Sequence, residues 1–271
     1  MSLRRIGLVA WHVFKESVRD RVLYGIGVFA VLLVLASLTI GQITAGQDLK
    51  IIKDLGLATI EIAGVLMTVF IGVGLVAREI DRRSVFSLLA KPLPRWEFIV
   101  GKYVGLVLTV AVNLWAMTVA FYLMLGWMYL VSPAGVRMVW DAPATDWHLL
   151  LQVVLFTAEM ALLTAIALFF STFSSSALMS VVFTVGIYVM GLASAELRGF
   201  NDIVDAPVVG SIVAAIGWLT PAFSEFDVKN EIVHGHPVPM VLVGSMVGYA
   251  AVYATALVVA AVTVFSRREF K

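Results

Sequence analysis

Two carboxylates that interrupt long apolar runs are the first residues whose types suggest chemistry. Glu61 lies in the run 55–77, and Glu159 lies near the middle of the run 149–170. An ionisable group inside a membrane is costly, so such a group often marks a transport path or a helix contact. We expect Glu61, Asn113 and Glu159 to serve one of these two roles. For Glu61 a hydrated position near the membrane surface is an equal alternative, and for Glu159 we favour a polar contact between helices.

Other polar residues form weaker patterns. His234 and His236 make an H-x-H, and imidazole is a common ligand of copper and zinc. The sequence has no cysteine, and two histidines alone are a poor site, so we expect no metal here. We interpret the charged residues just before this pair as a solvated helix face: Glu225, Asp227, Lys229 and Glu231.

The sequence lacks the phosphate-binding loop of an ATPase, G-x-x-x-x-G-K-[S/T]. Its only Gly-Lys pair, Gly101 and Lys102, is followed by Tyr103, and Trp96 stands where the first glycine would be. Without this backbone cradle for phosphates, we expect no ATP hydrolysis by the chain itself and no cofactor in it.

The composition indicates a membrane protein. Hydrophobic residues make up 61% of the 271 and charged residues 14%, whereas a soluble domain is about half apolar and a quarter charged. The mean hydropathy is +0.98. A net charge of +1 gives no reason to expect nucleic acid as a partner. The lipid bilayer is therefore the first partner that we expect.

Apolar runs predict an all-α polytopic fold with six membrane spans in one domain, 1–271. A span needs about 20 mostly apolar residues, and the runs are 22–43, 55–77, 103–127, 149–170, 177–195 and 238–265. Residues 1–21 have the pattern of an amphipathic helix in the headgroup plane. The segment 196–237 contains an apolar stretch that is too short to cross, which predicts re-entrant or interfacial helices there.

The distribution of Lys and Arg orients these spans. Of the 19 basic residues, 14 fall in 1–21, in 78–102 or in the tail after the last span. By the positive-inside rule we expect these segments, and hence both termini, on the cytoplasmic side of a bacterial inner membrane. The segment 196–237 is then external.

The charged segment 78–102 separates the second and third spans. Its sequence from Ile80 to Ala90 favours a short helix, which Pro92 ends because proline lacks a backbone N–H and restricts the residue before it. Pro94 suits the start of a second helix that leads back into the membrane. An ordinary basic loop is the alternative.

The charged segment resembles a segment in the permease subunits of type-2 ATP-binding-cassette (ABC) exporters, E-x-D-x-x-S-x-x-x-L-L-A-x-P-L-x-R-x-E-x-x-x-G-K. More narrowly, it is similar to the branch that includes permeases for the maturation of multicopper enzymes such as nitrous oxide reductase. The matching positions are Glu79, Leu88, Leu89, Pro92, Arg95, Glu97, Gly101 and Lys102. Arg83 and Ser84 depart from the Gly-Thr that many members carry.

This resemblance implies a six-span half-transporter with an N-terminal elbow helix and a cytoplasmic coupling helix. The coupling helix would dock on a separate cytosolic ATPase, present in two copies that carry ATP and Mg. A second permease copy or a homologue would complete the transporter, and an external accessory protein is compatible with it. We expect the coupling residues to be Glu79, Arg82, Arg83, Val85, Leu88, Leu89, Pro92 and Arg95.

Two other function classes compete with the permease. A stand-alone secondary transporter or channel often shows an internal repeat, and 1–126 shows no convincing similarity to 127–271. A membrane-embedded enzyme would need a convergent set of acids, bases or nucleophiles, which His148 and the isolated Glu159 do not supply. The substrate and the direction of transport stay open.

Overall fold

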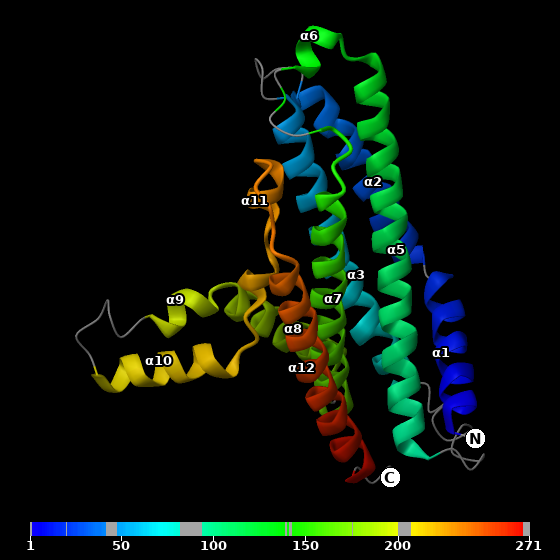
Figure 1. The fold of residues 1–271 in the computed structure, drawn as a ribbon. Helices are drawn as coiled ribbons and strands as arrows, with labels where there is room; N and C mark the ends of the chain where they lie inside the picture. The colour runs from blue at the N-terminus through cyan, green and yellow to red at the C-terminus, as the bar shows by residue number, and fades with distance from the viewer. Residues whose placement is uncertain are drawn as a thin grey trace.

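The computed structural model describes residues 2–19, 21–41, 48–81, 94–138, 140, 143–174, 176–199 and 207–267. In this part of the chain the elements are all helices (Figure 1). They are α1 (Ser2–Val18), α2 (Arg21–Gly41), α3 (Asp48–Asp81), α5 (Arg95–Val131), α6 (Ala134–Arg137), α7 (His148–Phe173), α8 (Ala177–Leu192), α9 (Ser194–Arg198), α10 (Pro207–Leu219), the 3₁₀-helix η2 (Phe223–Phe226), α11 (Lys229–Val233) and α12 (Met240–Arg267).

The long helices form a bundle around α7. Helices α3, α5, α8 and α12 all pack against α7, and α2 packs on α3 at the edge of the bundle. Leu155, Phe156 and Leu163 of α7 are fully buried. Because four helices cover α7 and these side chains are fully enclosed, α7 forms the centre of this bundle.

Four described helical segments are long and apolar enough to cross a membrane: Leu49–Val73, Arg95–Val131, His148–Phe173 and Met240–Arg267. Helix α10 and the following segment to Val233 make a fifth if this pair, bent by 44°, is one broken span. The apolar parts of α2 and α8 are shorter. Each of the six predicted runs thus contains a long helix. A spanning length is shown for four of these helices, and the count of six spans stays a prediction.

Helix boundaries differ from the predicted ones where charged residues flank an apolar run. Helix α3 runs from Asp48 to Asp81 and so extends beyond the predicted span 55–77 at both ends, including the polar residues at 48–54. Helix α5 runs unbroken from Arg95, so the predicted second helix of the charged segment and the third span are one helix. Hydropathy marks the apolar part of a helix, whereas backbone hydrogen bonds continue into the polar flanks.

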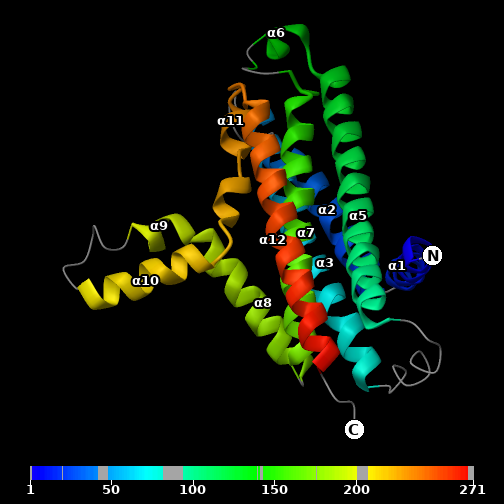
Figure 2. The same ribbon diagram turned by 60° about the horizontal axis from the view of Figure 1, so that its bottom comes forward.

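Helix α1 lies obliquely against the start of α5; Figure 2 shows α1 nearly end-on while α5 runs along the bundle. Ala10 and Val13 of α1 are buried in this contact. Two glycines of α5 make the close approach possible, since a Cβ added at Gly101 would lie 2.7 Å from the Val9 Cβ and one at Gly105 would lie 2.6 Å from the Ala10 carbonyl oxygen. The predicted N-terminal helix is present, and its place in the headgroup plane stays a prediction.

Helices α9 and α10 form an arm that projects sideways from the bundle (Figures 1 and 2). The arm is held together by its own residues: Arg198 Nε donates to the Gly217 carbonyl at 3.0 Å, and the guanidinium lies 4.8 Å from the Trp218 ring centroid. From the arm the chain returns to the bundle through residues 220–239, which we call the return segment. The short helices α10, η2 and α11 lie within 196–237, and their re-entrant or interfacial position stays a prediction.

Candidate functional site

Most of the predicted coupling residues lie outside the described residues. This holds for Arg82, Arg83, Val85, Leu88, Leu89 and Pro92, and the side chain of Glu79 is also not described. The ends that flank this gap are described: α3 ends at Asp81 and α5 begins at Arg95. Both ends lie at the pole of the bundle where α1 begins and α12 ends (Figure 1).

Arg95 ties this pole together. Helix α5 begins directly after Pro94, whose carbonyl accepts from the Glu97 N–H at 3.1 Å, as expected for a proline at a helix start. Arg95 Nη1 donates to the Ser266 carbonyl at 2.7 Å. The last carbonyls of a helix have no intrahelical donor, and a cation complements their partial negative charge. Arg95 therefore fastens the beginning of α5 to the end of α12.

Aromatic and acidic residues reinforce the same pole. The rings of Phe98 on α5 and Phe265 on α12 stack with centroids 6.2 Å apart. Glu97 is 4% exposed and its Oε2 lies 3.9 Å from Arg5 Nη1 of α1. The start of α5 thus contacts both α1 and α12.

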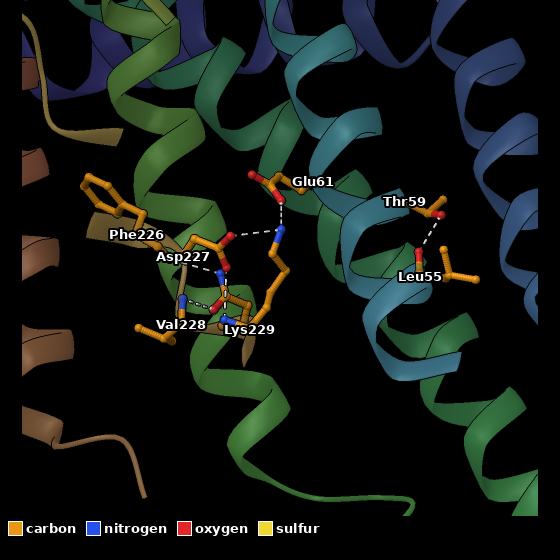
Figure 3. A network of polar contacts seen from close by, with 8 residues as sticks. Leu55, Thr59, Glu61, Phe226, Asp227, Val228 and Lys229 are labelled. Carbon is orange, nitrogen blue, oxygen red and sulfur yellow. Dashed lines mark hydrogen bonds and ion pairs between the residues drawn. The ribbon is translucent and has the colours of Figure 1, made fainter. Parts of the chain in front are cut away.

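A second polar site lies where the return segment meets the bundle (Figure 3). Lys229 Nζ binds Glu61 Oε2 of α3 at 2.5 Å and Asp227 Oδ2 at 3.2 Å. The Lys229 and Glu61 side chains are only 15% and 14% exposed, whereas that of Asp227 is 44% exposed. The expected solvated face is therefore wrong for Lys229, because its ammonium turns inward to a carboxylate on a membrane helix.

Gln152 of α7 holds the same segment through its backbone. The Gln152 Nε2 donates to the Phe226 carbonyl at 3.0 Å, and the Val228 N–H donates to Gln152 Oε1 at 2.9 Å. Gln152 is fully buried, so both bonds are shielded from water. Sequence reasoning missed this residue; its signal was a lone amide near the start of a long apolar run.

Glu159 lies deeper, at 2% exposure on α7. Tyr188 of α8 is its neighbour. Three residues before it on α7, the Phe156 ring centroid lies 5.9 Å from Lys229 Nζ, and one residue after it Met160 Sδ accepts from Thr68 Oγ1 of α3 at 3.5 Å. The Oε1 atom has no hydrogen-bond partner among the described residues. The structure thus brings Glu61 and Glu159 to one place, which we call the polar cluster together with Asp227, Lys229 and Tyr188.

Asn113 lies elsewhere. Its Nδ2 donates to the Thr109 carbonyl of its own helix at 2.8 Å, and its side chain lines an apolar cleft of about 470 Å³ between α1, α2 and α5. The cleft wall includes Phe14 and Met117. The bond from Asn113 thus goes to its own helix.

The histidine pair does not gain metal ligands from the fold. The rings of His234 and His236 lie 6.4 Å apart, and His234 Nδ1 is 2.8 Å from the Asn230 carbonyl. Within the described ranges, no three or more His, Asp or Glu side chains are placed to hold a metal ion. His148 is 2.7 Å from the neighbouring Asp146 carboxylate.

A comparison with protein families shows to which family this chain belongs. A family model described as ABC-2 family transporter protein matches residues 8–270. No curated protein matches the chain. The family match covers nearly all the helices described above and favours neither the multicopper-maturation branch nor any other. An ABC-2 permease is the membrane component that works with a cytosolic ATPase and is not itself catalytic. The helical bundle with its membrane-length spans therefore belongs to the ABC-2 family of transporter proteins, as the permease of an ABC transporter.

Proposed function

We propose that this permease is half of an ATP-driven exporter in a bacterial inner membrane, with six spans and both termini in the cytoplasm. Two permeases, identical or homologous, would pair, and two ATPase subunits would dock on the charged segment 78–102. ATP and Mg would bind only to those subunits. Closure of the ATPases would then move the segment and the helices on either side of it.

The observation that carries this proposal is the Arg95 link. The docking segment is joined to α3 on one side and α5 on the other, and Arg95 connects α5 to the end of α12. A push on one short segment would therefore act on three membrane helices at once. A stand-alone transporter or channel has no need for such a junction at the pole of the bundle.

The test uses two leucines of the predicted docking helix. In the permease with Leu88→Asp and Leu89→Asp, we expect loss of the co-purifying ATPase, because two charges replace the apolar contact surface. The measurement is the ratio of ATPase to tagged permease after affinity purification, together with vanadate-sensitive ATP hydrolysis. Retained ATPase at the wild-type ratio would refute the docking assignment.

A control places a single carboxylate at the other pole. Met138 is 86% exposed and directly follows α6, which lies at the end of α5 opposite to Arg95 (Figure 1). Met138→Asp should leave the ATPase bound at the wild-type ratio. Loss of ATPase in both variants would point to impaired insertion and not to a docking surface.

A further inference from the structure

The polar cluster holds more acid than base. Among the described residues, Glu61, Glu159 and Asp227 gather around a single lysine, Lys229. Charges removed from water need a partner of opposite sign or a proton. One ion pair between Lys229 and Glu61 would satisfy a purely structural role, and it leaves the second carboxyl of the bundle without a counter-ion.

Glu159 is that second carboxyl. A buried carboxyl oxygen without a hydrogen-bond partner is uncommon in a folded protein and points to a group that is satisfied in another state. Oε1 of Glu159 is such an atom within the described part of the chain, and the residue is 2% exposed. Glu159 lies one helical turn after Phe156 on α7, and the Phe156 ring centroid is 5.9 Å from the Lys229 ammonium.

Aromatic rings complete the surroundings of the ammonium. Lys229 Nζ lies 5.9 Å from the ring centroid of Phe156, which is fully buried. Tyr188, the neighbour of Glu159, packs against Phe223 with ring centroids 5.1 Å apart. Carboxylates beside aromatic faces are the chemistry that recognises an organic ammonium with an apolar body.

Lys229 also has a second carboxylate partner. It bonds Glu61 on the bundle and Asp227 on its own segment, and Asp227 is the more exposed of the two acids. A small shift toward Asp227 would release Glu61 while keeping the ammonium paired. The carboxylate on α3 could then accept a different cation without leaving a buried charge alone.

We propose that Glu61 and Glu159 form the binding site for a cationic group of the transported molecule, an organic ammonium with an apolar or aromatic body, and that Lys229 occupies this site in the present conformation. This inference rests on the proposed transport function and adds a substrate class to it. Lys229 acts as a tethered competitor. The return segment then serves as a cover that the incoming cation displaces.

The test measures binding of radiolabelled phenethylammonium to the full-length permease in lipid nanodiscs, with empty nanodiscs subtracted. Lys229→Ala should bind this probe about tenfold or more tightly than wild type, because a tethered competitor has a high effective concentration. If Lys229→Ala inserts poorly, Lys229→Gln takes its place, because glutamine keeps a hydrogen-bond donor for Glu61. Lys229→Gln should also bind phenethylammonium more tightly than wild type. Phenethyl alcohol, which lacks the charge, should show no such gain.

Two further variants locate the site. Adding Glu159→Gln or Glu61→Gln to Lys229→Ala should abolish saturable binding of phenethylammonium. Lys15→Ala, which removes an exposed cation of α1, should bind the probe like wild type. Equal affinity in wild type and Lys229→Ala, or saturable binding that survives both glutamine changes, would overturn the proposal.

The binding assay needs no ATPase, and this separates the two proposals. Loss of the ammonium site with an intact ATPase complex would reject only the substrate class. A permease that binds the probe as expected but never co-purifies an ATPase would reject the proposed exporter and keep the site.

Discussion

Two cations of this permease join parts of the chain that are far apart in sequence, and they do so in different surroundings. Arg95 donates to a backbone carbonyl at the end of α12, whereas Lys229 binds the Glu61 carboxylate of α3. A carbonyl at a helix end always needs a donor and never changes its charge. A carboxylate can exchange one cation for another. The first contact therefore fixes geometry, and the second is suited to being replaced.

The largest effect on stability should come from reversing the charge of Lys229. Lys229→Glu would place a third carboxylate against Glu61 and Asp227, and an unpaired buried charge costs about 3 kcal/mol or more. We expect a lower unfolding temperature of the purified permease and rapid proteolysis of the return segment. The measurements are thermal unfolding in detergent and limited proteolysis.

The charge swap is the control for this variant. Glu61→Lys combined with Lys229→Glu restores one ion pair and should recover part of the lost stability. If the double variant were no more stable than Lys229→Glu alone, Glu61 and Lys229 would not form an ion pair. The comparison between Lys229 and Arg95 would then fail.

A medium effect on stability is expected from Gln152, which holds the return segment through two uncharged hydrogen bonds. Gln152→Leu leaves the Phe226 carbonyl and the Val228 N–H buried and unpaired, which costs about 2–6 kcal/mol for the two groups together. Proteolysis of the return segment should increase while binding of the ATPase is unchanged. Gln152→Glu keeps the acceptor for Val228 and loses the donor, so its effect should be intermediate. An unchanged cleavage rate in Gln152→Leu would show that the lysine alone holds the segment.

The smallest effect on stability should follow from removing the fixed cation. Arg95→Ala removes a partly exposed side chain and its bond to Ser266, worth about 1 kcal/mol. The main effect should be on coupling between the permease and the ATPase. In the assembled complex, transport substrate should stimulate ATP hydrolysis less than in wild type. Arg95→Lys should recover part of this stimulation. If Arg95→Ala stimulated like wild type, the link to α12 would play no part in transmission.

The sequence predicted the helices well and their partners poorly. Apolar runs indicated all six long helices, because a membrane helix needs a continuous run of mostly apolar residues, which the local sequence shows directly. The helix start after Pro94 also follows from local residues. The pair between Glu61 and Lys229 joins residues 168 positions apart, and no local pattern encodes that distance. The local pattern therefore predicts a solvated stretch, although the Lys229 side chain is only 15% exposed.

The intramembrane acids show the same limit. Sequence alone marked Glu61 and Glu159 as unusual, since a carboxylate in an apolar run needs a reason. It gave no sign that they would meet, or that Gln152 would hold the segment above them. Asn113, marked by the same reasoning, bonds its own helix instead. Polarity within a run identifies candidates, and only packing decides which of them act together.

The glycines at the contact between α1 and α5 have a mechanical consequence. With no side chain at Gly101 or Gly105, the backbones of the two helices meet so closely that an added methyl group would collide with α1. Such an interlocked contact transmits force, because neither helix can slide past the other without separating. Helix α1 and the start of α5 should therefore behave as one lever, and a small tilt of α5 would sweep α1 across the pole of the molecule.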